Sequence, residues 1–194
     1  MLSDQGYDAD WFRDALQAKG LTPCIPGRKS RTEPVRYDKR RYKSRSRIEI
    51  MFGGLKDYKD KQVLLTGGSG AMGRLIAADI RKQGGRVTVI DRVAPEDGGR
   101  FIQGDLSTSE GLEALVDKVA AEPWDILINL AGIQHFGPLE AQHPDHLQAT
   151  YMVNLVAPTR LIHAVLPGMK ARGSGQIANV GSIFGSINFA HFAT

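Results

Sequence analysis

The sequence has little cysteine and no long apolar run, and each absence excludes a class of protein. Its 194 residues include one cysteine, Cys24, so the chain alone forms no internal disulfide and no cysteine-based metal cluster. No stretch approaches the roughly 20 apolar residues that a transmembrane helix needs. Residues 1–7 lack the basic start and apolar core of a secretory signal. Together these absences favour a cytoplasmic globular protein without a membrane partner.

Charge is distributed unevenly along the chain. The net charge is +4, but residues 1–61 carry six excess positive charges, whereas residues 62–194 carry two excess negative charges. Ten of the twenty residues from Arg28 to Arg47 are Lys or Arg, which is enough to attract phosphate backbones without sequence specificity. A solvated basic connector is the alternative. The opposite signs predict two segments of different character, with a boundary near residues 57–61.

Residues 62–194 alternate short β-branched runs with helical patterns, which is typical of a parallel sheet with crossover helices. The predicted strands are residues 62–66, 86–91, 100–103, 125–129 and 175–180. The predicted helices are residues 72–83, 107–121 and 144–172, the last bent or frayed at Pro167. The fold class is therefore α/β, with a Rossmann-type doubly wound parallel sheet that we expect to be incomplete. A short basic, mainly helical segment precedes it, with helices at 7–19 and 37–55 around a loop at 23–36.

A glycine-rich segment follows the first predicted strand. Thr66 ends that strand, and Gly68-x-Gly70-x-x-Gly73 leads into the next helix. Gly68 allows a tight turn, Gly70 removes a side chain where a pyrophosphate must approach, and Gly73 lets helix and strand pack closely. The helix then presents unpaired N–H groups and its positive dipole end to phosphates. This strand–turn–helix context predicts a dinucleotide site.

An acidic residue ends the second predicted strand. Asp91 lies 18 residues after Gly73. A carboxylate at this point accepts hydrogen bonds from both hydroxyls of an adenosine ribose and repels a 2′-phosphate, which favours NAD. Arg92 leaves NADP open, because a guanidinium pairs with a phosphate. A third interpretation is that Asp91 only forms the turn.

Residues 61–194 resemble the short-chain dehydrogenase/reductase family in a set of ordered motifs. The loop from Thr66 is similar to its Thr-Gly-x-x-Gly-x-x-Gly variant, with Ala71 where many members have glycine. Asp105-Leu106 resembles the pair beside the adenine ring. Residues 129–132, Asn-Leu-Ala-Gly, resemble the Asn-Asn-Ala-Gly motif with leucine in second place. Asn154 and Ser182 stand where the family carries its catalytic asparagine and serine.

The resemblance implies hydride transfer between a nicotinamide cofactor, NAD or NADP, and an alcohol or carbonyl substrate, with Asn154 and Ser182 catalytic. It implies that the cofactor is bound by Thr66, Gly67, Gly68, Ser69, Gly70, Met72, Gly73, Asp91, Arg92, Asp105, Leu106, Asn129, Ala131 and Gly132. The family's tyrosine, a general acid/base, and the lysine four residues after it are not among residues 1–194. We therefore expect a catalytically incomplete chain. His135 and His143 are interpreted as loop residues.

Residues 1–58 resemble the C-terminal part of a DDE-type insertion-sequence transposase. Tyr42, Arg45, Glu49 and Lys56 match a Tyr-x2-Arg-x3-Glu-x6-Lys signature, with spacings that place them along one helical face. The resemblance implies that Asp4 and Glu49 are two of the three carboxylates that hold two Mg²⁺ ions. Arg45 and Lys56 would contact DNA phosphates. The alternative is a solvated amphipathic helix.

Three functions therefore compete. The first is an oxidoreductase fragment, residues 61–194, that binds NAD(P) without turnover. The second is a DNA-binding transposase remnant that makes weak non-specific contacts through residues 28–56. The third is a fusion of a transposon end with a truncated reductase gene that has neither activity. The sequence identifies neither the substrate nor the oligomeric state.

Overall fold

The computed structural model divides the chain into two compact units, residues 1–56 and 57–194. It describes residues 10–18, 20, 35 and 57–182. In the first unit, helix α1 (Asp10–Ala18) buries Leu16 completely. It lies within the helix predicted at residues 7–19. The loop and basic helix predicted at residues 23–55 fall outside the described residues, apart from residue 35.

A five-stranded parallel sheet forms the centre of the second unit. Its strands are β1 (Gln62–Thr66), β2 (Arg86–Asp91), β3 (Arg100–Gln103), β4 (Ile126–Asn129) and β5 (Gln176–Asn179). They lie in the order β3-β2-β1-β4-β5, and every neighbouring pair is parallel. Thr66 is level with both Ile90 and Asn129, and Asn129 is level with Asn179. The carboxyl ends of the strands therefore form one edge.

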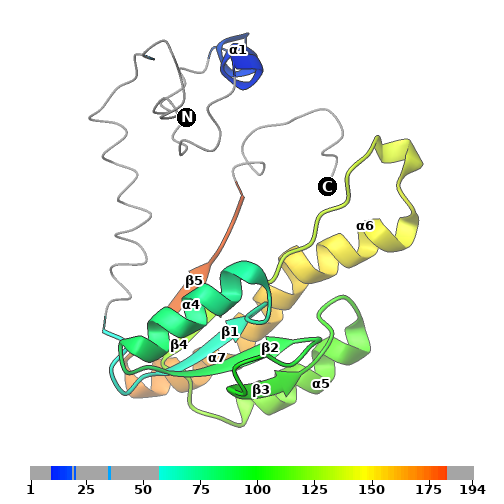
Figure 1. The fold of residues 1–194 in the computed structure, drawn as a ribbon. Coiled ribbons are helices and arrows are strands. Elements are labelled where there is room, and N and C mark those ends of the chain that lie inside the picture. Colours follow the sequence, from blue (N-terminus) through cyan, green and yellow to red (C-terminus); the bar gives the residue numbers. More distant parts are fainter. Residues whose placement is uncertain (1–9, 19, 21–34, 36–56, 183–194) are drawn as a thin grey trace. The chain divides into compact units, whose positions relative to one another are not determined.

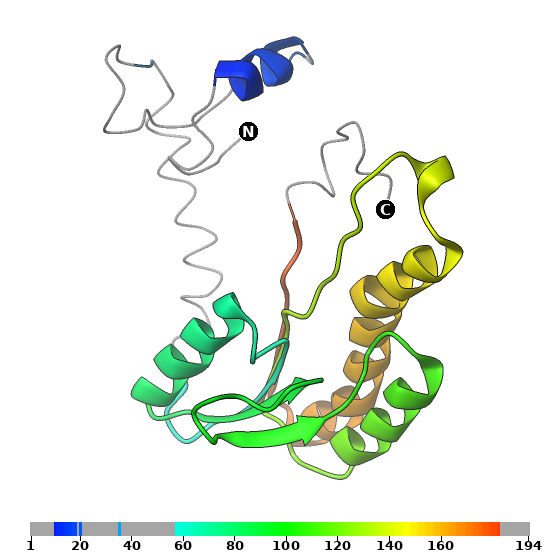
Figure 2. The same cartoon turned by 45° about the vertical axis from the view of Figure 1, so that its right-hand side comes forward.

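Helices cover both faces of this sheet. Helix α4 (Ala71–Lys82) covers one face, and α5 (Ser109–Ala120) and α7 (Ala157–Arg172) cover the other (Figure 2). The central strands are buried on both faces, so β1 and β4 read as continuous apolar runs rather than alternating ones. The main core cluster joins Leu64 and Leu127 of the sheet to Leu115 of α5 and Leu161 of α7. The predicted α/β fold class is confirmed, and the observed strands agree with the predicted ones to within one residue.

The helix predicted over residues 144–172 is interrupted. It consists of α6 (Pro144–Tyr151), a π-helical turn η3 (Met152–Val156) and α7. Pro158 has no N–H, so the carbonyl of Asn154 lacks the donor that an α-helix would supply, and this explains the irregularity at η3. The helix continues past Pro167 to Arg172, so the fraying predicted at Pro167 is wrong.

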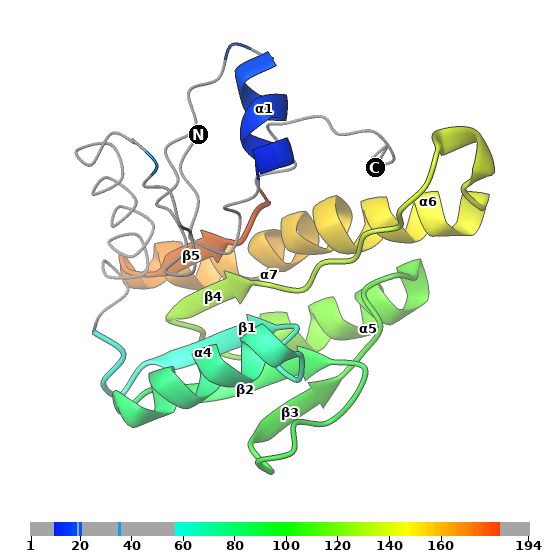
Figure 3. The same cartoon turned by 45° about the horizontal axis from the view of Figure 1, so that its top comes forward.

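Helix α6 extends beyond the carboxyl ends of the strands (Figures 1 and 3). A short 3-10 turn, η2 (Leu139–Ala141), precedes it. His143 caps its first turn by accepting a hydrogen bond from the Asp145 N–H at 3.2 Å. Within the described residues, no helix has both the length and the apolarity needed to cross a bilayer.

Candidate functional site

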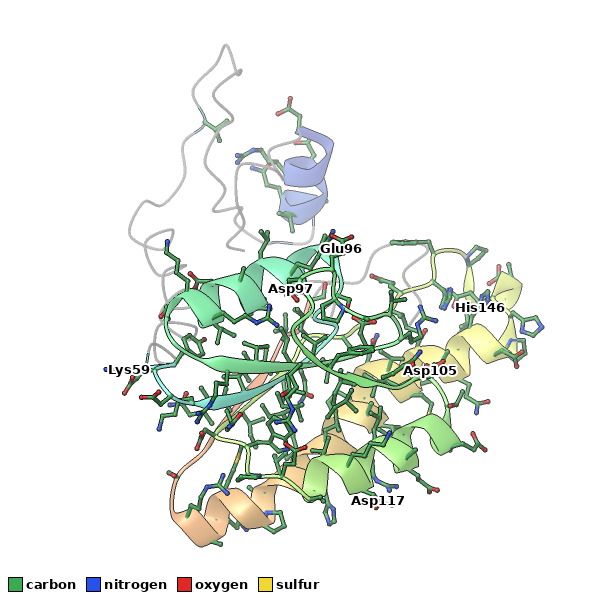
Figure 4. All side chains as sticks on the ribbon, turned by 60° about the horizontal axis from the view of Figure 1, so that its bottom comes forward. Lys59, Glu96, Asp97, Asp105, Asp117 and His146 are labelled. Carbon is green, nitrogen blue, oxygen red and sulfur yellow. The ribbon has the colours of Figure 1, made fainter. Side chains whose placement is uncertain are left out.

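A cleft of about 720 Å³ lies at the carboxyl ends of the strands. The strand order reverses between β1 and β4, and such a switch point is where open α/β sheets bind ligands. Asp105 and His146, both on the cleft, lie at the same end of the sheet, opposite Lys59 (Figure 4). Of the predicted cofactor residues, the cleft is lined by Gly67, Gly70, Met72, Gly73, Asp91, Arg92, Asp105, Leu106, Ala131 and Gly132.

Gly67 makes the tight turn after β1. Its φ of +70° lies in the left-handed region, and a Cβ there would come 2.9 Å from the Cα of Ala131. The prediction that Gly68 makes this turn is wrong, because Gly67 and not Gly68 has the left-handed φ. Gly68 instead packs on β2, where a Cβ would come 2.6 Å from a methyl of Val89.

The remaining glycines of the cleft divide into two kinds. A Cβ on Gly73 would overlap the backbone of Gly67 and Gly68, so glycine is required for the helix to meet the turn. A Cβ on Gly70 or Gly132 would meet only ordinary contacts, at 3.4 Å and 3.5 Å. Packing within the protein does not demand glycine at these two positions. Their place on the cleft instead fits a ligand that approaches the backbone.

Asp91 joins β2 to the glycine turn. One carboxylate oxygen accepts a hydrogen bond from the Ser69 N–H at 3.0 Å, and the other accepts one from the Arg92 N–H at 2.7 Å. The Ser69 hydroxyl donates to the carbonyl of Val93 at 2.6 Å. Ser69 does not line the cleft; its contacts hold the turn beside Asp91.

Asp105 presents a charged carboxylate where β3 ends. One oxygen accepts hydrogen bonds from the Ser107 N–H at 2.8 Å and from the Ser107 hydroxyl at 2.6 Å. These two bonds, with a smaller contribution from the positive charge of Arg92, lower the pKa of Asp105 below its ordinary value against the opposing effect of burial. The group is therefore ionised at neutral pH and places a charged acceptor at the cleft.

Thr66 and Asn154 fix the chain that follows β4. The buried Thr66 hydroxyl accepts hydrogen bonds from the N–H groups of Leu130 and Ala131, at 3.1 Å and 3.0 Å. The Asn154 side chain accepts one from the Ile133 N–H at 2.9 Å and donates one to the Ile133 carbonyl at 2.8 Å. Neither side chain lines the cleft. Both side chains instead hold backbone segments that line the cleft.

Asn129 and Ser182 lie at the β4–β5 side of the same edge. The buried Asn129 side chain donates a hydrogen bond to the Asn179 side chain at 2.8 Å, while its own Oδ1 is buried and has no hydrogen-bond partner among the residues that the structure describes. Ser182 is exposed, three residues beyond the end of β5. Neither residue lines the cleft.

The predicted metal ligands Asp4 and Glu49 lie outside the described residues. In the part of the chain that the structure describes, no group of three or more His, Cys, Asp or Glu side chains is placed to hold a metal ion.

Sequence reasoning missed the α6 side of the cleft. His146, Ala149 and Val153 line it, together with His135 from the loop after β4. Their spacing of three and four residues along one predicted helix face was the available signal. His135, interpreted from sequence as a plain loop residue, stacks on His146 with ring centroids 4.1 Å apart.

Comparison with known proteins agrees with this arrangement. Residues 61–194 match the family model described as short chain dehydrogenase. A short chain dehydrogenase of Pseudocercospora fijiensis is 35% identical over 139 residues, covering 63% of this chain and 45% of that protein. The chain spans about half the length of the curated relatives it matches.

Solved structures show the same fold. A short chain dehydrogenase from Leptospira borgpetersenii with bound NAD+ gives a TM-score of 0.60 at 30% identity, covering 67% of this chain and 54% of that one. A metagenomic short-chain oxidoreductase in complex with NADP gives 0.63 at 31% identity, with coverages of 71% and 68%. The sheet and the cleft agree with the family match, which covers more than half of the sequence. The chain belongs to the short chain dehydrogenase family.

Proposed function

We propose that residues 57–194 bind a nicotinamide dinucleotide in the cleft, as the cofactor-binding part of an oxidoreductase. The observation that carries this proposal is that Gly70 and Gly132 line the cleft although the protein's own packing does not require glycine there. The cleft volume of about 720 Å³ is within the usual range for ligand sites. The similar solved structures with bound NAD+ or NADP support the same assignment.

The residues present fit the chemistry of a dinucleotide. The amino end of α4 follows the glycine turn, and its N–H groups and dipole favour phosphates. Asp91 would accept the hydroxyls of the adenosine ribose, and Asp105 would accept donors from the adenine ring. Bound nicotinamide would supply or accept the hydride. We extend the proposal of cofactor binding to the other predicted residues. Met72 and Ala131 line the cleft, and Thr66 holds the backbone of Leu130 and Ala131 in place.

We propose NAD as the preferred cofactor. Asp91 already accepts two backbone hydrogen bonds, so its carboxylate is fixed at the end of β2 and would oppose the charge of a 2′-phosphate. Arg92 lines the same cleft and keeps NADP as the second choice. An Asp91→Asn variant removes the negative charge and should reduce the preference for NADH over NADPH by roughly tenfold, equivalent to about 1.4 kcal/mol.

The proposed reaction is hydride transfer with an alcohol or carbonyl substrate. Asn154 would act through the backbone of Ile133, and Ser182 would donate a hydrogen bond to a substrate oxygen.

Fluorescence titration of the full chain with NADH and NADPH tests the proposal. We expect saturable binding of both, tighter for NADH. A Gly70→Leu variant, which places a bulky side chain at the cleft, should abolish saturation while its circular dichroism stays unchanged. Absence of saturable binding by the unmodified chain would overturn cofactor binding.

The basic segment supports a second candidate function, non-specific DNA contact through residues 28–56. Ten basic residues within positions 28–47 would release counterions from a phosphate backbone, so binding should weaken steeply with salt. Gel-shift assays at two salt concentrations test this, with residues 57–194 expressed alone as the control. Binding that salt does not weaken contradicts it. The transposase origin of residues 1–58 and a cytoplasmic location stay predictions.

A further inference from the structure

A short connection, residues 92–99, joins β2 to β3 beside the cleft. Parallel strands are usually joined by a crossover of a dozen or more residues that contains a helix. This connection is shorter, and its residues, all of which the structure describes, form no helix. It begins at Arg92, which lines the cleft directly after Asp91, and the Ser69 hydroxyl of the glycine turn donates to its Val93 carbonyl at 2.6 Å. The connection therefore leaves the sheet at the point where we place the adenosine ribose.

Two carboxylates of this connection form ion pairs with arginines of α4. Glu96 pairs with Arg74 at 2.7 Å, and Asp97 pairs with Arg81. Figure 4 shows both carboxylates beside α4. The two arginines are seven residues apart in the helix, which separates their Cα atoms by roughly 10 Å along its axis. Of the two pairs, the one with Arg74 lies at the end of α4 that follows the glycine turn.

Arg74 belongs to the first turn of α4, next to the cleft. It follows Gly73, which lines the cleft, and its N–H donates to the carbonyl of Gly70, another lining residue, at 2.9 Å. Its own side chain is occupied by Glu96, and Arg74 does not line the cleft. A guanidinium on a long flexible side chain binds phosphate through a planar fork of donors. The pair with Glu96 therefore decides whether this cation is available to a ligand.

The second arginine at this corner of the cleft is not occupied in this way. The positive charge of Arg92 contributes to the lowered pKa of Asp105, so Arg92 lies near that carboxylate. Within the part of the chain that the structure describes, however, Arg92 forms no ion pair. Arg92 is thus the available cation of the adenosine end of the cleft, and Arg74 is the occupied one.

We propose that Glu96 is a positioning residue that sets cofactor specificity: by pairing with Arg74, it withholds a second cation from the 2′-phosphate of NADPH. The inference rests on the proposed function, since it requires a dinucleotide in the cleft. Asp91 opposes the 2′-phosphate by its own charge, and Glu96 opposes it by keeping Arg74 occupied. The chain thereby contains an arginine that supports NADPH binding once its partner is removed.

Fluorescence titration of the full chain with NADH and NADPH tests this inference. Glu96→Gln should raise the affinity for NADPH relative to NADH by about threefold, in keeping with the small energies of exposed charge pairs. Arg74→Gln added to Glu96→Gln should abolish this gain, and Arg74→Gln alone should produce none. The gain should nearly disappear when salt is raised from about 0.05 M to about 0.5 M, because salt screens exposed charges.

Asp97→Asn is the matched control. It removes a carboxylate of the same connection, paired with an arginine of the same helix but roughly 10 Å farther from the glycine turn. A connection that only supports the cleft would affect NADH and NADPH by the same factor when it is loosened. The ratio of the two affinities should therefore change in Glu96→Gln and stay constant in Asp97→Asn.

A second measurement isolates the 2′-phosphate. Adenosine 2′,5′-bisphosphate and adenosine 5′-monophosphate differ only in that group, and each is titrated in competition with NADH. Glu96→Gln should raise the affinity for the bisphosphate relative to the monophosphate by about threefold, as it does for the intact cofactors. An unchanged ratio would show that the 2′-phosphate does not sense Arg74.

The outcomes separate this inference from the proposed function. If NADH binds and Glu96→Gln leaves the ratio of NADPH to NADH affinity unchanged, the inference is overturned while cofactor binding stands. A gain that persists without Arg74, or that Asp97→Asn reproduces, also overturns it, because the effect then comes from net charge alone. If neither cofactor binds to the unmodified chain, the proposed function fails, and this inference fails with it.

Discussion

The two sides of the cleft are held in place in different ways. On one side, the glycine turn (residues 67–73) is fixed mainly by backbone contacts, in addition to the side-chain hydrogen bonds of Asp91 and Ser69. Gly73 meets the backbone of Gly67 and Gly68, and Gly67 donates a hydrogen bond to the Ile90 carbonyl at 2.9 Å. On the other side, the β4 loop (residues 130–142) is held by side chains. Thr66 and Asn154 hold its beginning, and the His135–His146 stack holds its middle.

This difference predicts different responses to substitution. Backbone contacts at close approach leave no room to relax, so a single added methyl group disturbs the whole turn. Side-chain contacts can be lost one at a time, and each loss should loosen only the segment that it holds. The glycine turn is thus expected to be rigid, and the β4 loop to be adjustable.

The largest effect is expected for Gly73→Ala. The added Cβ overlaps backbone atoms of Gly67 and Gly68, which cannot move aside as a flexible side chain would. We expect a loss of about 3 kcal/mol in the free energy of unfolding, at the upper end for overpacking. Urea unfolding measures it.

Gly70→Ala is the matched control for this substitution. The same methyl group meets the Gly67 carbonyl at an ordinary distance of 3.4 Å, and Gly70 is the N-cap of α4 with a φ of −70°. The stability loss should stay below about 1 kcal/mol, the scale of a changed cap residue. Equal losses for the two variants would contradict the assignment of Gly73 to packing and Gly70 to the ligand.

Thr66→Val should have the next largest effect. Valine keeps the shape of threonine but leaves the N–H groups of Leu130 and Ala131 without their acceptor. The free energy of unfolding should fall by about 2 kcal/mol, the usual cost of unsatisfied buried donors. Thr66→Ser retains the hydroxyl and should lose much less. A Thr66→Val protein as stable as Thr66→Ser would show that these bonds do not hold the β4 loop.

Asn154→Ala tests the second attachment of the β4 loop. It removes both hydrogen bonds to Ile133, which are partly solvent-exposed, so we expect a loss of only about 1 kcal/mol. Amide exchange at Ile133 should accelerate while exchange in the glycine turn is unchanged. Asn154→Asp keeps an acceptor for the Ile133 N–H and should protect that amide better than alanine. Faster exchange in both regions would show that the two sides are not independent.

Ser107→Ala should have the smallest effect, confined to acid. It removes the hydroxyl bond that contributes most to the lowered pKa of Asp105, so that pKa should rise toward its ordinary value. Because the folded-state pKa is depressed, the stabilisation by Asp105 is present above the ordinary aspartate range and is lost as pH falls through the folded value. NMR titration of the Asp105 carboxyl measures the shift. An unchanged pKa would contradict the role of Ser107.

The sequence predicted the strands and the glycine segment well because both depend on local patterns. The runs Val63–Leu65 and Ile126–Ile128 are apolar without alternation, as strands buried on both faces require. The sequence could not show that Gly67 rather than Gly68 has the left-handed φ, since the two glycines are adjacent and each lies against a residue distant in the chain, Ala131 and Val89. The His135–His146 stack was missed because it joins a loop to a helix. Local sequence patterns do not predict how these two segments lie relative to each other.

The π-helical turn was not predicted. The apolar pattern across residues 144–172 continues without a break, so periodicity alone predicted one helix. Pro158 lacks the N–H that would close the α-helical bond to the Asn154 carbonyl, and the π-helical turn lies there. Pro167 likewise leaves the His163 carbonyl without this donor, yet α7 continues to Arg172. The position of a proline alone therefore does not determine where the helix is interrupted.

The paired amides of Asn129 and Asn179 have a consequence for the alignment of β5. Parallel strands held by apolar contacts alone could slide by one residue, which moves each side chain by about 3.3 Å and reverses the face on which it lies. The 2.8 Å bond between the buried Asn129 and the exposed Asn179 matches amide to amide only in the observed pairing. It thereby fixes the register of β5 against β4, and it determines where the chain leading to Ser182 leaves the sheet.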